Sequence, residues 1–421
     1  MPIDGWRSLR LGDFVTLQRG HDLPIQLRRP GNVPILGSFG VTGTHDEAKA
    51  KGPGVTVGRS GASFGVVSYC PTDYWPLNTA LYVVDFHGND ERFAYYFLRS
   101  IDFSRFNSGS AQPSLNRNFI HPIPIEVPSF REQRSNAELL GSIDDKIDLN
   151  RRMNETLEAM ARAIFKSWFV DFDPVGAKME GRQPVGMDAD TAALFPDTLD
   201  DSPGASIPSG WIETALKDEI ELLTGLAFKS ERFVETPPGV RLARGDNVKE
   251  GFFEWGTKSR FWPEMAPELE RYLLNVGDVL IGMDGSKVGK NWVRVRDTDL
   301  PCLLVQRVAR LRARASVGEH FIALLVSDQR FMGFVNSVRT GTSIPHISSN
   351  QILTYPFHRP PRGDDRLFHR LEQMVDPLAR RQDSNVREMN TLASLRDLLL
   401  PKLFSGEIRV KDADTALGTL A

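Results

Sequence analysis

The chain repeats itself once, and this duplication constrains the fold more than any other feature of the sequence. The matched blocks are Trp6–Gly20 with Trp211–Gly225, Val55–Gly65 with Val279–Gly289, Gly109–Pro128 with Gly341–Pro360, and Thr156–Phe169 with Thr391–Phe404. They occur in the same order, and the separation between matched residues only grows along the chain. This is the pattern of a tandem duplication with insertions in the second copy, and it excludes a solenoid of short repeats.

Each copy begins with a part rich in glycine, proline, aromatic and β-branched residues, at about 1–130 and 208–360. Short apolar runs between turn residues predict strands, among them 55–57, 80–86, 278–281 and 306–311. Ala94–Arg99 and Phe321–Val326 predict one helix in each copy. Each part is therefore expected to be an α+β domain.

Each copy ends in a long helical segment, expected at 131–170 and 361–404. Apolar residues alternate in steps of three and four along both segments, which is typical of a coiled coil with helices about 55 Å long. The predicted seam includes Asn150, Asn154 and Asn385, which would fix the register if buried, or would face solvent at a local unwinding. It also includes Arg381, and Pro377 is expected to kink or interrupt the second helix. The alternative is two separate helices, each packed on its own domain.

Residues 171–207 hold two basic residues against eight acidic ones and are rich in proline and glycine. Without an amphipathic period, they are expected to form an extended acidic linker on the surface. Residues 405–421 are expected to be a C-terminal tail.

The order domain, helix, domain, helix suggests an architecture. If the helices pair in opposite directions, a pseudo-two-fold axis relates the copies, and two α/β-mixed domains are separated by an antiparallel coiled-coil spacer. Two-fold related readers bind DNA half-sites about one turn apart. Because the second copy carries an insertion with Phe252 and Trp262, the two readers are expected to recognise unlike half-sites.

Composition excludes several classes of protein. The chain is 41% hydrophobic and 25% charged, which is typical of globular protein. It has no apolar run of about 18 residues, and its start lacks a secretory pattern, so we expect a cytoplasmic protein with no membrane contact. Cys70 and Cys302 are too few for a zinc site and suit a reducing compartment. The net charge of −3 does not suggest a strongly basic nucleic-acid binder, but it leaves local basic loops open.

Two sets of loop residues are the best candidates for DNA contacts. Glycines let backbone N–H groups approach phosphate, and Arg or Lys can contact phosphate or guanine. The glycine-motif set is Arg59, Ser60 and Ser63 in the first copy and Asp284, Ser286, Lys287, Lys290 and Asn291 in the second. The set after the Gly-Pro repeat is Ser110, Gln112, Asn116 and Arg117 in the first copy and Thr342, Ser343, His346 and Asn350 in the second. The alternatives are tight strand-connecting turns for the first set, and helix caps for the second.

Catalytic motifs are missing from the sequence. There is no GxxxxGK[ST] phosphate loop, no HExxH and no CxxC, and no paired carboxylates stand out as an acid/base couple. No catalytic residue and no metal ligand is therefore expected, which favours a binding protein over an enzyme.

Several stretches resemble the specificity (S) subunit of type I restriction–modification enzymes. Asn150–Val175, which reads NRRMNETLEAMARAIFKSWFVDFDPV, is similar to the central conserved helix of that family. Leu395–Val410, LRDLLLPKLFSGEIRV, is similar to the distal conserved region. IPSGW at 207–211 resembles the start of a target-recognition domain. The resemblance covers essentially the whole chain in the right order.

The resemblance implies a non-catalytic DNA specificity subunit. Two target-recognition domains would read an asymmetric bipartite duplex site, and the conserved helices would dock two modification subunits, which are adenine methyltransferases. No cofactor is expected on this chain: S-adenosylmethionine, ATP and Mg would belong to the modification subunits and to restriction subunits with translocase and nuclease activity. The alternatives are the specificity subunit of a type IIB-like enzyme and a coiled-coil scaffold that binds only protein.

Overall fold

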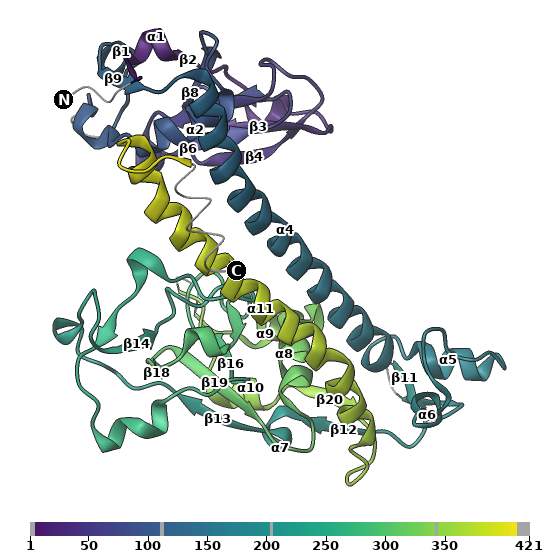
Figure 1. Cartoon of the computed structure of the whole chain (residues 1–421). Coiled ribbons are helices and arrows are strands. Elements are labelled where there is room, and N and C mark those ends of the chain that lie inside the picture. Colours follow the sequence, from purple (N-terminus) through teal and green to yellow (C-terminus); the bar gives the residue numbers. More distant parts are fainter. Residues whose placement is uncertain (1–4, 110–112, 203–204, 342–343, 411–421) are drawn as a thin grey trace. The chain divides into compact units, whose positions relative to one another are not determined.

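The computed structural model describes residues 5–109, 113–202, 205–341 and 344–410. Its contacts divide the chain into two compact units. The first unit contains the chain up to Leu149 together with the residues from Glu388 onward, and the second unit contains Asn150–Arg387. Each unit holds one sheet-rich domain and part of each of two long helices, α4 (Phe130–Phe169) and α11 (Arg366–Phe404) (Figure 1). The predicted α+β class is confirmed.

The first domain is built from short strands and short helices, with cores on both sides of its main sheet. Its elements are β1 (Arg7–Arg10), α1 (Leu11–Phe14), β2 (Thr16–Arg19), η1 (Ile25–Leu27), β3 (Val33–Gly37), β4 (Gly40–His45), β5 (Gly54–Gly58), η2 (Gly61–Ser63), β6 (Val67–Cys70), β7 (Trp75–Pro76), β8 (Ala80–Asp85), α2 (Glu91–Ser100), η3 (Phe103–Phe106), α3 (Arg117–Ile120) and β9 (Pro124–Val127). The main sheet has the strand order β2-β8-β5-β6, a second sheet has the order β4-β3-β7, and β1 pairs with β9.

The second domain repeats this topology. Its elements are β12 (Ile212–Ala215), α7 (Leu216–Glu219), β13 (Ile220–Thr224), η4 (Ser230–Arg232), β14 (Val240–Ala243), η5 (Gly256–Lys258), β15 (Phe261–Trp262), η6 (Pro267–Tyr272), β16 (Val279–Gly282), β17 (Trp292–Arg294), η7 (Asp297–Asp299), β18 (Cys302–Leu304), β19 (Val308–Ala313), α8 (Glu319–Ser327), α9 (Gln329–Val338), α10 (Ser349–Leu353) and β20 (Pro356–Arg359). The sheets have the orders β13-β19-β16-β17, β15-β14-β18 and β12-β20.

The correspondence between the domains extends to strand direction. The pairs β3·β7 and β14·β18 are both parallel, whereas the main sheets are antiparallel. Gly58 lies opposite Ala80 in the first domain, and Gly282 lies opposite Val308 in the second. The duplication inferred from sequence is therefore a duplication of fold.

The two long helices pair in opposite directions. In the first unit, Asp144 on α4 accepts a hydrogen bond from Arg396 on α11 at 2.7 Å, and Lys146 lies 3.4 Å from Glu388. In the second unit, Asn154 on α4 contacts Asn385 at 2.8 Å. Higher numbers on α4 meet lower numbers on α11, so the antiparallel pairing is confirmed, and the alternative of two unpaired helices is wrong.

The seam of this pair differs from the prediction at one position. Arg381 is exposed, and Gln382 takes its place by donating a hydrogen bond to the backbone oxygen of Asn154 at 3.0 Å. The asparagines do face the partner helix, because Asn150 and Asn385 are fully buried. An alternation of steps of three and four averages about 3.5 residues per turn, whereas an α-helix has about 3.6. The helix face predicted from that alternation therefore rotates along the helix, which explains why the contact falls on Gln382 instead of Arg381.

Pro377 does not interrupt α11, which is helical throughout its 39 residues. The proline ring is exposed, so it makes no clash with α4, and the carbonyl that loses its N–H partner can be hydrated. The prediction of a break at this proline was wrong.

The second domain is tied to α11 by charged groups. Asp383 accepts hydrogen bonds from Arg294 and Arg296, each at 3.0 Å. About three turns earlier along the same helix face, Glu372 accepts the backbone N–H of Phe321 at 2.9 Å at the start of α8. Burial raises the pKa of Glu372 to about 7, against the opposing effect of these N–H groups.

Residues 171–202 and 205–207 contain two helices and two paired strands, so the prediction of an extended linker was wrong. They form α5 (Asp173–Met179), α6 (Ala189–Ala193) and a hairpin of β10 (Leu199–Ser202) and β11 (Ala205–Pro208). Val175 and Phe195 are buried in the core of the second unit, where Phe195 lies edge-on to Trp168 at 5.5 Å. A few large apolar residues, too widely spaced to show a period, are enough to anchor two short helices.

Both cysteines are buried. Among the described residues, no helix combines the length and apolarity needed to cross a membrane. The aromatic insertion contributes to a core, because Phe253 and Trp262 are buried, although Phe252 is half exposed.

Candidate nucleic-acid interface

The two candidate loops of each domain, which are far apart in sequence, lie side by side. In the first domain, Leu115 donates its N–H to the carbonyl of Arg59 at 2.7 Å, and Gly61 donates to Pro113 at 3.2 Å. In the second domain, Ile347 donates to Met283 at 2.9 Å, and Gly285 donates to Pro345 at 3.0 Å. Strand pairing therefore joins the glycine motif and the Gly-Pro motif into one surface in each domain.

The glycines of the first motif are required by this close approach. A Cβ at Gly58 would lie 2.0 Å from the backbone oxygen of Ser63 and 2.3 Å from that of Ser38. Gly61 has a φ of +78°, in the left-handed region that favours glycine. The glycine pattern is therefore explained by the turn itself, and the binding hypothesis depends on the side chains around it.

Those side chains surround a cavity of about 360 Å³ in the first domain. Its lining residues are Gln18, Arg19, Arg59, Leu81, Ser108, Ser114, Leu115, Asn116 and Arg117. The lining includes three arginines and no carboxylate. Within the ranges that the structure describes, none of the three has a carboxylate oxygen within 4.0 Å. The cavity is therefore a concentration of unneutralised positive charge with amide and hydroxyl groups around it.

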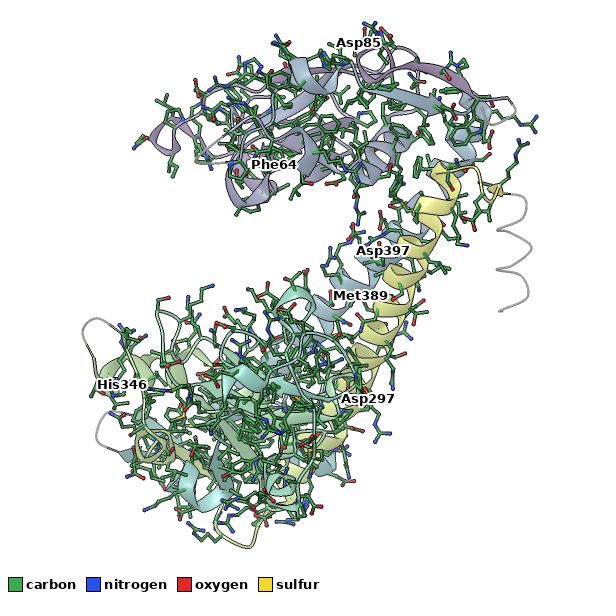
Figure 2. All side chains as sticks on the ribbon, turned by 90° about the vertical axis from the view of Figure 1, so that its left-hand side faces the viewer. Phe64, Asp85, Asp297, His346, Met389 and Asp397 are labelled. Carbon is green, nitrogen blue, oxygen red and sulfur yellow. The ribbon has the colours of Figure 1, made fainter. Side chains whose placement is uncertain are left out.

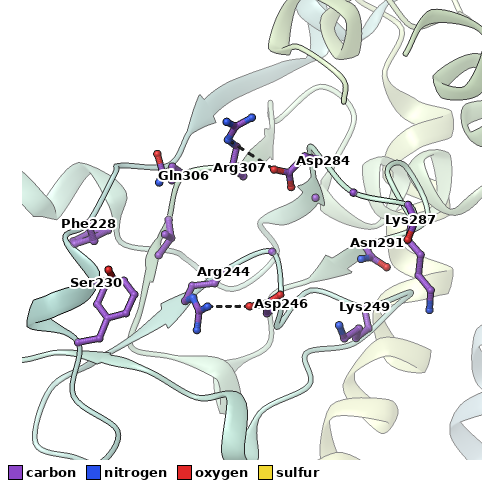
Figure 3. Close-up of a pocket in the computed structure, with 16 residues that line it drawn as sticks. Phe228, Ser230, Arg244, Asp246, Lys249, Asp284, Lys287, Asn291, Gln306 and Arg307 are labelled. Atoms are coloured by element: carbon purple, nitrogen blue, oxygen red, sulfur yellow. Dashed lines mark hydrogen bonds and ion pairs between the residues drawn. The ribbon is translucent and has the colours of Figure 1, made fainter. Parts of the chain in front are cut away.

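The second domain has a cavity of about 580 Å³ beside its own glycine motif, lined from other positions of the repeat than the first cavity. Its lining residues are Phe228, Ser230, Phe233, Arg244, Gly245, Asp246, Lys249, Gly282, Asp284, Gly285, Ser286, Lys287, Asn291, Val305, Gln306 and Arg307. The lining includes four cationic side chains and two carboxylates. This cavity is therefore also positively charged, but less strongly than the cavity of the first domain. Figure 3 shows two facing pairs, Arg244 with Asp246 at 2.9 Å and Arg307 with Asp284 at 3.8 Å.

Each cavity includes an arginine from one backbone pair next to the glycine motif. The N–H of Arg59 donates to the carbonyl of Thr79 at 2.9 Å, and the N–H of Met283 donates to the carbonyl of Arg307 at 2.9 Å. These are equivalent backbone pairs, yet the arginine is on the first residue in one domain and on the second in the other. The two arginines therefore line different cavities.

Seven of the sixteen predicted contact residues line these cavities. They are Arg59, Asn116 and Arg117 in the first domain and Asp284, Ser286, Lys287 and Asn291 in the second. Ser60, Ser63, Lys290, His346 and Asn350 belong to the same loops but are not in the lining. Ser110, Gln112, Thr342 and Ser343 lie outside the described residues.

Some predicted residues have a structural role of the kind considered as an alternative. Asn116 caps α3 by accepting the N–H of Asn118 at 3.0 Å, although it also faces the cavity. The imidazole of His346 is 2.8 Å from the hydroxyl of Thr340 and bridges the ends of its own loop. Figure 2 labels His346 on this loop of the second domain.

The sequence analysis missed Arg244, Lys249 and Arg307. Arg244 and Lys249 follow β14 in the insertion, and Arg307 precedes β19. Arg307 has a φ of +68°, which is uncommon for a residue other than glycine. No motif marks these positions, and only the pairing of β14 with β18 and of β16 with β19 brings them together.

The comparisons with known proteins agree on one family. Residues 3–159 match the model of the type I restriction modification DNA specificity domain. The chain is 25% identical over 325 residues to the type I restriction enzyme MjaIX specificity subunit of Methanocaldococcus jannaschii, covering 76% of this chain and 69% of that one. It is 31% identical over 187 residues to the EcoAI specificity subunit of Escherichia coli, covering 43% of this chain and 31% of that one.

The fold is similar as well. The crystal structure of the type I restriction–modification S subunit from M. genitalium matches with a TM-score of 0.55 over 95% of this chain and 96% of that one, at 17% sequence identity. The chain is thus similar to type I restriction–modification specificity subunits over most of its length, and its residues 3–159 match their DNA specificity domain.

Proposed function

We propose that this chain is the DNA-reading subunit of a type I restriction–modification complex and carries no catalytic site of its own. Each sheet-rich domain reads one half of an asymmetric, bipartite duplex site. The observation that carries the proposal is a cationic cavity beside the glycine motif of each repeated domain. A polyanion is the ligand class that such cavities attract.

The side chains in the cavities can recognise DNA bases as well as attract the phosphate backbone. Arginine donates two parallel hydrogen bonds to guanine O6 and N7 or to a phosphate, and amide side chains such as those of Gln18 and Asn116 pair with adenine. Both types surround the first cavity. The different linings support two different half-sites.

The partners follow from the family. Two modification subunits, which are adenine methyltransferases, dock on the chain, and restriction subunits join them for translocation and cleavage. S-adenosylmethionine, ATP and Mg belong to those subunits. We propose that α4 and α11, whose sequences carry the family resemblance, serve as the spacer and the docking element.

The test is a sequence-selection experiment on the intact complex. The full chain is purified with its modification subunit and used to select duplexes from a random library at about 0.15 M salt. One enriched motif with two unlike halves and a fixed gap is expected, with adenine methylation inside it. Enrichment of no sequence, with the partner present, would refute the proposal and favour a scaffold that binds only protein.

A further inference from the structure

The two glycine motifs differ at one pair of positions that the backbone places identically. Ser60 and Ser114 form a β-bridge in the first domain, and Asp284 and His346 form the equivalent bridge in the second. Two hydroxyl groups in the first cavity region thus correspond to a carboxylate and an imidazole in the second. The carboxylate is unexpected, because a site for a polyanion is weakened by a negative charge.

The backbone around Asp284 is fixed by hydrogen bonds, whereas its carboxylate has only a long contact with Arg307. Its neighbours are fixed by the hydrogen bonds from Met283 to Arg307 and from Gly285 to Pro345. The closest approach to Arg307 is 3.8 Å, between Oδ2 and Nε, which is too long for a hydrogen bond. The side chain is 33% exposed, so its oxygens can still accept hydrogen bonds from a ligand.

The carboxylate belongs to the lining of the cavity. Its Oδ1 lies 4.0 Å from the point where a Cβ at Gly245 would be, so this neighbour presents no side chain to it. Figure 3 shows Asp284 and Arg307 on one side of the cavity and Arg244 with Asp246 on the other. A flat ligand edge against Asp284 and Arg307 would meet an acceptor and a donor side by side.

We propose that Asp284 determines the base specificity of the second domain by accepting a hydrogen bond from the exocyclic amino group of a cytosine or adenine in the major groove. The exocyclic amines of these two bases are the donors of the major groove, so a carboxylate there selects for them. It also repels phosphate and bases that offer only acceptors. The inference rests on the proposed function and adds a ligand chemistry to one of its two sites.

The first domain lacks this device, since Ser60 stands at the equivalent position. The requirement for a base amine at this point therefore applies to one half-site. Substituting Asp284→Ser installs the residue of the first domain at a backbone position that accepts it. Asp284→Asn removes the charge but keeps an acceptor oxygen.

The experiment uses the full chain in complex with its modification subunit and the duplex selected above. Each cytosine or adenine of the second half-site is replaced in turn by an analogue without the exocyclic amine. We expect the wild type to lose affinity by about tenfold at one position, equivalent to about 1.4 kcal/mol, and the base at that position identifies cytosine or adenine as the source. The Asp284→Ser protein should be indifferent to that analogue, and Asp284→Asn should keep part of the preference.

Affinity for unrelated DNA distinguishes a loss of base recognition from a folding defect, because only a folding defect lowers it. Removing the carboxylate should leave affinity for a scrambled duplex unchanged or raise it. A matched control is Glu264→Gln, which neutralises an exposed acid of the same domain paired with Arg232, and which should change neither measurement. If Asp284→Ser discriminates the analogues as the wild type does, or loses affinity for all duplexes equally, the inference is overturned while the proposed function stands. If the wild-type complex selects no sequence, both are overturned.

Discussion

The three arginines of the first cavity predict how strongly DNA binding depends on salt. Each cation that neutralises a phosphate contributes about 0.9 to the slope of log affinity against log salt concentration. Substituting Arg19, Arg59 and Arg117 together by glutamine should therefore flatten the slope by about 2.7, if all three contact phosphate. Between about 50 and 200 mM salt, this difference corresponds to a factor of about 40 in affinity.

The assay is fluorescence anisotropy of a labelled duplex, titrated with the full complex at four or five salt concentrations. The matched control is Arg29→Gln in the same domain. Arg29 is exposed but forms ion pairs with Asp46 at 2.7 Å and Glu47 at 3.6 Å. Its substitution should therefore leave the slope of log affinity against log salt concentration unchanged. The single variants show how the effect is divided among the three arginines.

A smaller change in slope has a defined meaning. An arginine that contacts guanine instead of phosphate leaves the slope nearly unchanged, but its loss removes the preference for that base pair. A triple variant with both the wild-type slope and the wild-type base preference would refute the argument that this cavity binds DNA.

Three further predictions concern stability, measured by urea unfolding with tryptophan fluorescence. Arg359→Met should lower the free energy of unfolding by about 3–5 kcal/mol, because it leaves the buried carboxylate of Glu219, now 2.5 Å from Arg359, without its cation. Asn385→Leu should lower it by about 1–2 kcal/mol, because the Oδ1 atom of Asn154 loses its donor, and Asn154→Leu in the same chain should restore most of the loss. Glu372→Gln should raise stability at pH 8 by about 1–3 kcal/mol, because a carboxyl whose pKa is raised to about 7 favours the folded state below pH 4.5 and loses that contribution as the pH rises through 7.

Each of these has an outcome that would contradict it. Arg359→Met within about 1 kcal/mol of the wild type would mean that Glu219 is hydrated in the folded protein. A stable Asn385→Leu protein would show that the asparagine contact does not contribute to helix pairing. If Glu372→Gln leaves the pH dependence between 4.5 and 7 unchanged, another group is responsible for it.

The fold was predictable because its signals are local or repeated. The turn of the glycine motif needs a positive φ at Gly61 and at its counterpart Gly285, at +78° and +92°, so glycine persists there in both copies. The long helices are recognisable from the periodic spacing of their apolar residues. Their antiparallel pairing follows from the order domain, helix, domain, helix. The same reasoning failed for residues 171–207, where Phe195 and Val175 contribute to a core without any periodic pattern.

The site was predictable only in part. The residues found from sequence belong to the two loops that carry glycine and proline. Arg244 and Arg307 were missed, because nothing near them in sequence marks their role. The arginines at 59 and 307 show why: they belong to equivalent backbone pairs but to different members of the pair, so the position of one does not predict the other.

The sequence by itself determined the duplication, the α+β class, the long paired helices and the two candidate loops of each copy. These depend on backbone geometry and on hydrophobic periods, which neighbouring residues express directly. Only the tertiary structure decided which side chains meet, and with which charge: three arginines without an acid in one cavity, and Asp284 beside Arg307 in the other. Side chains from distant segments come together through strand pairing, and that information is not carried by any single stretch of the chain.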